Sequence, residues 1–336
     1  MATLKQGEEL KMKILKNITV PTGNILIVEG EKGKLECLSI GDYGKEKNLK
    51  ADFLGLKNEI NGVPHGDIIP LEEKWVITIS TQYGCSMGCS FCDVPKVGHG
   101  KNATFNDLIK QVITGIHLHP EVTYTKRLNI HYARMGEPTF NPNIIDATKW
   151  LKEHIDKEYK IHPVVSTMMP KNNQWLKLFI HTWMRIKNRL LEGEAGLQIS
   201  VNSTNQKERD IMFNDNALSL FDIYKIMDGI IPFGRKITLN FALSGYEIDE
   251  AELLKYFDPD NYVIKLTPMH LTKSCVGNGL RTDGGYDYFY PYKEVEERLK
   301  KSGYDVIVFV PSHEEDESKI TCGNAILSEA WKPSVI

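Results

Sequence analysis

The string Tyr83-Gly84-Cys85-Ser86-Met87-Gly88-Cys89-Ser90-Phe91-Cys92 says more about the fold of this chain than any other stretch. It places Cys85, Cys89 and Cys92 at C-x3-C-x2-C spacing in one glycine-containing loop. Three thiolates in this arrangement can hold three corners of a cubane iron–sulfur cluster and leave the fourth iron without a protein ligand. Electron-transfer clusters normally have four cysteine ligands, whereas an open coordination position lets a metal bind a small molecule directly. The loop therefore predicts a [4Fe–4S] cluster with one open iron.

Other uses of three clustered cysteines fit the sequence less well. Structural zinc takes four ligands, usually as two pairs, and no second C-x2-C or H-x3-H pair follows Cys92. A disulfide framework is typical of secreted chains, and the segment Met1–Gln6 has no apolar signal sequence. The spacing, with the aromatic Phe91 between the second and third cysteines, resembles that of radical S-adenosylmethionine (SAM) enzymes, in which SAM chelates the open iron.

Composition favours an ordinary soluble protein. The chain has 336 residues, of which 41% are hydrophobic and 25% charged, and no apolar run approaches the roughly 20 residues that cross a bilayer. The formal net charge of −3 gives no global signal for nucleic-acid binding but leaves room for a local basic face. Six cysteines, three of them in one loop, favour a reducing compartment. We expect a cytoplasmic protein that has no membrane partner; the sequence leaves the oligomeric state open, with a monomer favoured.

The N-terminal part of the chain reads as β-rich. An apolar run at Ile25–Val28 precedes a turn signal at 29–33, and an alternating run follows at Leu35–Ile40. From residue 74 onwards, apolar strands alternate with helical stretches. We therefore expect residues 1–65 to form a small β-rich N-terminal segment and residues 66–336 to form a barrel with a C-terminal extension.

Alternation of strands and helices predicts βα units and a parallel sheet. The expected strands are Trp75–Thr81, Leu128–Ala133, Pro163–Thr167, Leu197–Val201, Ile237–Leu243, Tyr262–Thr267 and Asp305–Val310. The expected helices lie near 104–118, 143–156, 173–187, 205–212, 218–228, 249–256 and 291–302. Right-handed crossovers would curl this sheet into a partial (β/α)6 TIM-like barrel, with functional residues at the carboxyl ends of its strands. The cysteine loop follows the first of these strands.

Polar residues follow several of the expected strands. After the second strand comes Gly136-Glu137, where glycine allows close approach to a ligand and the carboxylate can accept hydrogen bonds from an ammonium group; a plain turn with a solvated acid is the alternative. Ser166 ends the third strand, Ser200-Val201-Asn202 ends the fourth, and His270 follows the sixth. Such residues often only cap strands, yet at the mouth of a barrel they can bind the carboxylate or ribose of SAM.

One further cysteine, in Thr321-Cys322-Gly323, lies near the end of the chain after the acidic stretch 314–317. A free structural thiol and a functional thiol are both open readings of Cys322. Cys37 lies in an alternating strand and is expected to be buried, and the sequence assigns no role to Cys275.

Taken together, these strings resemble the RlmN/Cfr family of radical SAM RNA adenine methyltransferases over about residues 60–330. The matching strings are Ser80-Thr81-Gln82-Tyr83-Gly84-Cys85, Cys89-Ser90-Phe91-Cys92, Met135-Gly136-Glu137-Pro138, Ser166-Thr167, Ile199 to Asn205, Glu208-Arg209-Asp210, Ser302-Gly303-Tyr304 and Cys322-Gly323-Asn324. Members of that family methylate C2 or C8 of adenosine in ribosomal RNA and, in some cases, transfer RNA.

The resemblance implies a mechanism. In that family one SAM methylates a C-terminal cysteine, and a radical from a second SAM abstracts a hydrogen from this methyl group, whose carbon then adds to adenine. The resemblance makes Cys322 the methyl carrier and places SAM contacts at Gly136, Glu137, Ser166, Ser200, Val201 and Asn202. It implies a [4Fe–4S] cluster and SAM as cofactors, RNA as substrate, and a flavodoxin- or ferredoxin-type reductant.

The chain departs from the family pattern at several positions. Thr78 stands where the family has a second cysteine that resolves the protein–RNA adduct, and a hydroxyl is a much poorer acid–base group than a thiol. A family glutamate falls near His65, and His270 replaces an asparagine that contacts SAM. The family's helical N-terminal RNA-binding region is missing or replaced by the β-rich segment.

These departures leave two other hypotheses open. The first is a radical SAM enzyme that modifies a nucleotide or small metabolite without methylating it. The second is a non-catalytic RNA-binding relative that keeps the iron–sulfur cluster as a structural or redox element. In that reading, the basic stretches Arg185–Arg189 and Lys126-Arg127 would touch phosphates, although each is more often a solvated surface.

Overall fold

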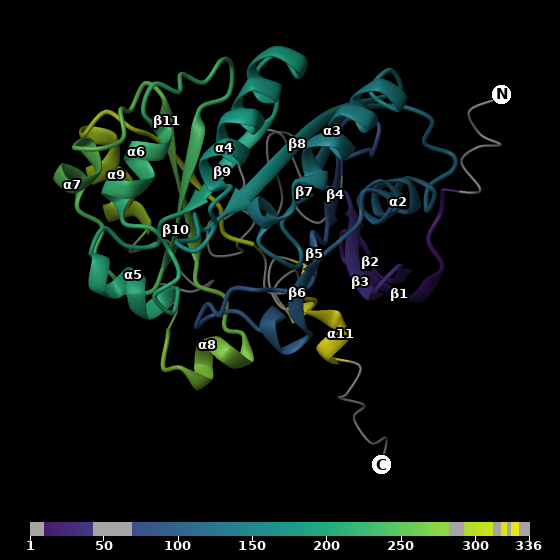
Figure 1. Cartoon of the computed structure of the whole chain (residues 1–336), viewed down its shortest axis with the longest axis horizontal. Coiled ribbons are helices and arrows are strands. Elements are labelled where there is room, and N and C mark those ends of the chain that lie inside the picture. The colour runs from purple at the N-terminus through teal and green to yellow at the C-terminus, as the bar shows by residue number, and fades with distance from the viewer. Residues whose placement is uncertain (1–9, 43–68, 282–291, 312–316, 321–323, 329–336) are drawn as a thin grey trace.

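The computed structural model describes residues 10–42, 69–281, 292–311, 317–320 and 324–328. His65 and Cys322 lie outside these ranges. Within them, ten strands form one sheet in the order β1-β2-β3-β4-β7-β8-β9-β10-β11-β12 (Figure 1). A separate two-stranded sheet consists of β5 (Gln82–Gly84) and β6 (His99–Asn102).

The β-rich N-terminal strands extend the barrel sheet. Strands β1 (Ile14–Val20), β2 (Gly23–Gly30) and β3 (Gly33–Ile40) form an antiparallel meander. Strand β3 then pairs antiparallel with β4 (Trp75–Ile79), with Leu38 opposite Thr78. The strands expected near 25–40 are confirmed, and they lie at the edge of the main sheet. The domain boundary at residue 65 stays a prediction.

Parallel pairing joins the seven later strands in chain order, which confirms the fold class. After β4 these are β7 (Thr125–Tyr132), β8 (Tyr159–Thr167), β9 (Gly196–Ser200), β10 (Ile237–Leu243), β11 (Tyr262–Pro268) and β12 (Asp305–Val308). Strand β8 begins before Pro163, where the sequence predicted its start. Proline has no backbone N–H to donate to a neighbouring strand. Strand β8 nevertheless continues across Pro163, because residues on both sides of it pair with β7, from Ile161↔Leu128 to Val165↔Tyr132.

Helices occupy the predicted places between these strands. They are α2 (Phe105–Ile116), α3 (Asn143–His154), α4 (Leu176–Arg185), α5 (Gln206–Met212), α6 (Leu220–Met227), α7 (Glu250–Leu254) and α9 (Tyr292–Lys301). Helix α4 continues into a π-helical turn at Ile186–Leu190. Two short helices, α8 (Lys273–Gly277) and α11 (Ala325–Ser328), were not predicted because so few residues carry no periodic signal.

The two faces of the parallel strands differ in character. Outward-facing side chains pack under the helices, and Tyr132 Oη lies 2.8 Å from Thr148 Oγ1 of α3. Along β10 the outward Leu239 and Phe241 are fully buried, whereas the alternate Thr238 and Asn240 keep partial exposure. The apolar core therefore lies between sheet and helices, and the interior face of the sheet is polar and partly open.

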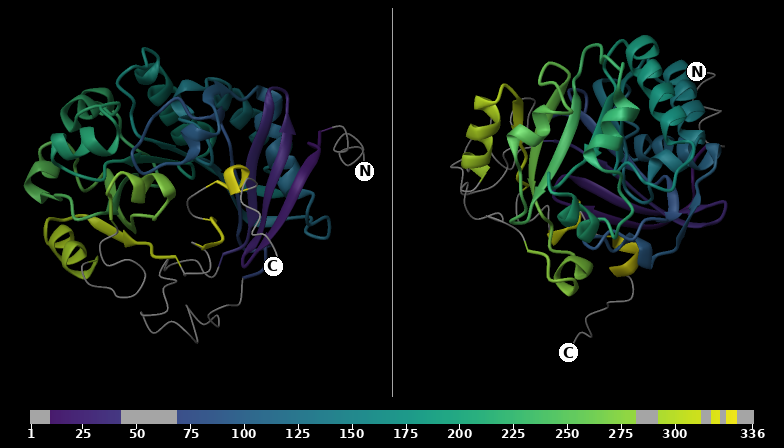
Figure 2. Two further views of the ribbon diagram at one scale, coloured as in Figure 1. Left: turned by 90° about the horizontal axis from the view of Figure 1, so that it is seen from below. Right: turned by 60° about the vertical axis from the view of Figure 1, so that its left-hand side comes forward.

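The last described helix packs against the first strands of the chain. Helix α11 lies beside β2 and β3, as the views in Figure 2 show. Within the described residues, none of the helices combines the length and the apolar content that a bilayer crossing requires.

Candidate cluster and cofactor site

The cysteine loop follows β4 and β5 at the carboxyl end of the parallel sheet. Cys85, Cys89 and Cys92 are all half-buried, and a tight turn joins Cys92 N to Cys89 O at 3.1 Å. Burial raises the pKa of Cys85 to about 11. Burial, followed by the neighbouring Cys92 and Cys85, raises the pKa of Cys89 well above its usual value. The thiolate forms of these cysteines are thus unfavourable without a ligand, whereas a bound cationic centre would lower their pKa and stabilise the thiolates.

The three thiols lie in one loop and have the chemistry of iron–sulfur ligands. Among the described residues, no group of three or more His, Cys, Asp or Glu side chains is arranged to hold a metal ion. A cubane cluster binds each cysteine at a different iron. The chemistry of the donor set therefore fits a three-cysteine [4Fe–4S] cluster.

Elements far away in sequence hold this loop in place. Ser90 donates to the last turn of α5, from N to Met212 O at 2.8 Å and from Oγ to Ile211 O at 2.6 Å. Asp93 caps α8, accepting from Ser274 N at 3.0 Å and Ser274 Oγ at 2.7 Å. The loop is therefore clamped on two sides, a restraint that its own sequence did not reveal.

A small apolar cluster rich in sulfur packs against the cysteines. Its buried members are Met87, Met168, Met212, Phe213, Ala217, Met269, Cys275 and Leu280. Met168 Sδ lies 3.6 Å from Cys89 Sγ. This cluster gives Cys275 a packing role and keeps the surroundings of Cys89 apolar.

The Gly136-Glu137 turn is bonded directly to the start of the cysteine loop. Met135 O accepts from Thr81 N at 2.8 Å and from Gln82 N at 3.1 Å. Gln82 Oε1 in turn accepts from Glu137 N at 3.0 Å. Gly136 has φ +93°, and a Cβ there would stand 2.5 Å from Gln82 Cβ. Only glycine allows this close approach; Gln82 is a linking residue that sequence reasoning missed.

Glu137 is buried but well supplied with donors. Its Oε1 accepts from Thr139 Oγ1 at 2.7 Å and Thr167 Oγ1 at 2.6 Å, while Oε2 accepts from Met168 N at 3.1 Å. Burial raises the pKa of this carboxyl, and these hydrogen bonds oppose the rise. Because a carboxylate offers about four acceptor positions, Oε2 keeps capacity for a further donor.

The other predicted contacts lie along the same edge of the sheet. Ser166 and Ser200 stand at the ends of β8 and β9 and are partly exposed, whereas Val201 is buried. Asn202 is buried in the left-handed region at φ +62°, and its Oδ1 accepts from Ala242 N at 3.0 Å. His270 follows β11 at this edge. The structure thus gathers the strand-end residues, although their contacts with SAM stay predictions.

Arg209 stabilises this edge of the sheet by hydrogen bonds to backbone carbonyl groups. Its guanidinium is fully buried and donates to Val201 O and, at 2.8 Å, to Leu218 O. It also lies 5.4 Å from the ring centroid of Phe213, which stacks edge-on against Phe91 of the cysteine loop. The string Glu208-Arg209-Asp210 therefore has a structural purpose, because it joins the loop after β9 to the cysteine loop.

Thr78 lies one residue before the carboxyl end of β4. It sits in β4 opposite His131 of β7. Burial lowers the pKa of His131 to about 3, helped by the positive charges of Lys265 and Arg235. The interior next to Thr78 is therefore a positively charged region that keeps a histidine neutral.

Known proteins resemble this one in overall fold and in part of the sequence. No protein-family model matches the chain. Its fold is similar to that of a radical SAM methyltransferase from Sphaerobacter thermophilus, with a TM-score of 0.63 and 17% identity over 93% of this chain and 80% of that one. The two chains thus share a partial (β/α) barrel fold.

Sequence similarity points to a particular group of enzymes. The chain is 34% identical over 109 residues to the dual-specificity RNA methyltransferase RlmN of Campylobacter lari, covering 32% of this chain and 30% of the relative. It is 33% identical over 145 residues to RlmN of Nitratiruptor sp., covering 42% of this chain and 38% of that protein. The chain therefore spans about a third of the length of these curated relatives, and over that part it is RlmN-like.

The packing around Gly136 predicts a large effect of a single methyl group. Gly136→Ala adds a left-handed strain of about 1–2 kcal/mol and, because the new Cβ clashes with Gln82, at least about 1 kcal/mol more. Gly229→Ala is the matched control, since Gly229 has φ +76° with nothing within 4 Å of its Cβ position. Denaturant unfolding of both variants measures the difference, and equal losses would show that the close approach to Gln82 is absent.

The environment of His131 predicts an acid-sensitive contribution to stability. The unfolded chain takes up a proton near its ordinary pKa of 6.5, while the folded protein resists protonation down to about 3. Stability from this site is therefore fully present above pH 6.5 and is lost as the pH falls toward 3. His131→Asn should flatten the pH dependence of the free energy of unfolding in this window. Identical pH slopes for both proteins would contradict a buried neutral His131.

Proposed function

We propose that this protein is a radical SAM enzyme that methylates an adenine carbon of RNA through Cys322. The observation that carries the proposal is the joined pair of loops at the mouth of a radical SAM-type barrel. Met135 O, just before Gly136-Glu137, accepts from Thr81 N and Gln82 N, just before the loop that holds Cys85–Cys92. RlmN-like sequence over part of the chain supports methylation of RNA.

The residues have separate roles in this proposal. Cys85, Cys89 and Cys92 would hold the [4Fe–4S] cluster, and the free capacity of Glu137 Oε2 suits the ammonium group of SAM. Ser166, Ser200 and Asn202 would accept or donate to its carboxylate and ribose. When bound, cluster and SAM would together supply a 5′-deoxyadenosyl radical. The protein itself orients the groups and keeps water out with the methionine-rich cluster.

Positive charge in the barrel interior supports an anionic substrate. Burial is the main cause of the lowered pKa of His131, and the positive charges of Lys265, Arg235 and Arg127 add to it, so these three charges lie within reach of one residue. Phosphates are attracted to positive charge.

One basic stretch suggested by the sequence, Arg185–Arg189, does not contribute all its charges to the surface. Lys187 is buried and donates to Gly193 O at 3.3 Å and to Phe233 O. The lysine caps carbonyl groups within the fold, so it cannot meet a phosphate.

The proposal includes partners and place. A flavodoxin- or ferredoxin-type protein would donate the electron that reduces the cluster, and the cytoplasm is the proposed compartment.

A second candidate function keeps the radical chemistry without methylation. Thr78 favours it, because this side chain faces the positive interior near His131 and cannot act as the thiol that would release an RNA adduct.

The first test concerns the methyl carrier. After anaerobic expression with methyl-labelled methionine, mass spectrometry of the Cys322 peptide should show a labelled S-methyl group. Cys322→Ala should abolish RNA methylation and leave SAM affinity unchanged, with Cys37→Ala, a buried thiol on β3, as the control. A variant that still methylates RNA, or an unlabelled Cys322 in protein that cleaves SAM, would favour the second candidate.

The second test restores the missing thiol. If RNA is methylated through Cys322, Thr78→Cys should shorten the lifetime of the covalent protein–RNA adduct, because a thiol is a far better acid–base group than a hydroxyl. Thr78→Ser is the control that keeps a hydroxyl. Gel analysis of adduct decay measures the effect. An unchanged lifetime would mean that another group releases the adduct, and His65 would be examined first.

A further inference from the structure

A buried ion pair links the N-terminal strands to the Gly136-Glu137 turn. Glu36 of β3 and Arg134, which follows β7, have side chains that are only 0% and 4% exposed. Arg134 Nε donates to Glu36 Oε1 at 2.5 Å, and the same carboxylate oxygen forms the ion pair with Nη2. Burying two charges is costly unless their remaining donors and acceptors are also satisfied.

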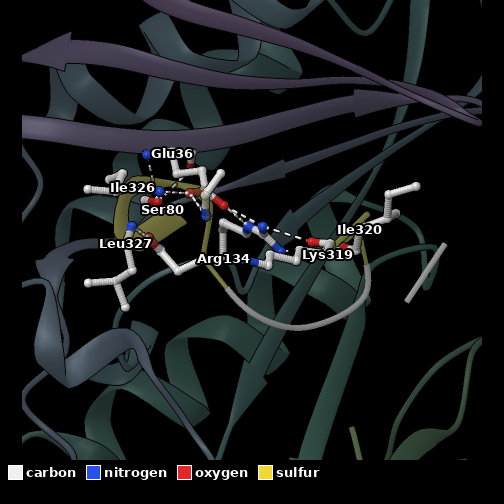
Figure 3. Close-up of polar contacts among 9 residues, drawn as sticks. Glu36, Ser80, Arg134, Lys319, Ile320, Ile326 and Leu327 are labelled. Carbon is white, nitrogen blue, oxygen red and sulfur yellow. Dashed lines mark hydrogen bonds and ion pairs between the residues drawn. The ribbon is translucent and has the colours of Figure 1, made fainter. Parts of the chain in front are cut away.

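Those remaining groups are satisfied by one segment near the end of the chain. On one side, Arg134 Nη2 donates to Lys319 O at 2.9 Å and Nη1 donates to Ile320 O at 3.4 Å. On the other side, Glu36 Oε2 accepts from Ala325 N at 2.7 Å and from Ile326 N at 3.1 Å. Figure 3 shows the pair between these two stretches of backbone. Each charge thus binds one flank of residues 321–323.

Cys322 lies outside the described residues, two positions after Ile320 in the sequence. Arg134 is itself only two residues before Gly136. The pair therefore ties residues 319–320 and 325–326, which flank Cys322 in the sequence, to the turn that is proposed to contact SAM.

We infer that Glu36 and Arg134 are positioning residues that hold residues 319–320 and 325–326, the two flanks of the Cys322 segment, next to the Gly136-Glu137 turn. This inference rests on the proposed role of Cys322 as methyl carrier. It also gives the β-rich N-terminal strands a part in the site, because they supply the acid of the pair. An apolar pair of similar size would fill the same space without gripping any backbone group.

The experiment replaces both charges together, because removing one alone would strand the other in the interior. In the double variant Glu36→Met/Arg134→Met the thermal midpoint should stay close to that of the unaltered protein. Hydrogen exchange at the amides of Ala325 and Ile326 should become fast, since their acceptor is gone. Methylation of Cys322 should fall about 10- to 100-fold, as expected for a misplaced reacting group, while SAM affinity is unchanged.

A matched control uses the other buried pair at the same sheet junction. Asp42 and Lys74 form an ion pair with side chains 11% and 12% exposed. Asp42→Leu/Lys74→Met should leave both the exchange at Ala325 and the methylation of Cys322 unchanged. Arg134→Lys provides a finer test. A lysine keeps the charge, but its single nitrogen cannot bind two carbonyl groups and the acid in the same geometry. The variant should therefore keep the buried acid paired, while methylation of Cys322 still falls.

Two results would overturn the inference. One is unchanged exchange at Ala325 and Ile326 in the double variant, and the other is faster exchange with full methylation of Cys322. If Cys322 carries no methyl group even in the unaltered protein, the proposed function fails, and the exchange comparison alone then decides whether the pair fixes the segment.

Discussion

The backbone pairing between the start of the cysteine loop and the turn after β7 is the constraint on which the site depends. Met135 O accepts hydrogen bonds from Thr81 N and Gln82 N, so two loops about 50 residues apart in sequence act as one rigid edge. Parallel pairing of β4 with β7 brings them together. Since Gly136 has no side chain, Gln82 can lie against its backbone and hold Glu137 beside the cysteines.

Apolar side chains surround the cysteines at this edge, whereas polar side chains line the inner face of the sheet. Methionines and Phe213 pack round the cysteines, which lowers the local dielectric and strengthens any electrostatic contact with a bound group. In the barrel interior, burial is the main cause of the lowered pKa of His131, and the positive charges of Lys265 and Arg235 add to it. Other barrel interiors are filled with branched apolar side chains; here inward positions of β10 such as Thr238 and Asn240 are polar.

Much of the fold followed from local patterns. Period-2 apolar runs and helical stretches predicted every strand from β4 to β12 of the parallel sheet, within a few residues. The predictions missed what has no local period: α8, the β5–β6 hairpin and the entry of β1–β3 into the main sheet. Lys187 shows the same limit, because its burial depends on carbonyl groups at Gly193 and Phe233 that no pattern around it announces.

For the site, the chemical groups can be read without the fold: three thiols at C-x3-C-x2-C spacing, a Gly-Glu turn after the next strand, and one further cysteine near residue 320. Ligand type and local spacing are covalent properties, so they are visible in the sequence. The contacts that hold these parts together are visible only in the folded protein. The clamp from Ser90 and Asp93, the brace from Arg209 and the grip of Glu36 on Ala325 all join distant residues. Such contacts exist only once packing has excluded water and made each buried charge find a partner.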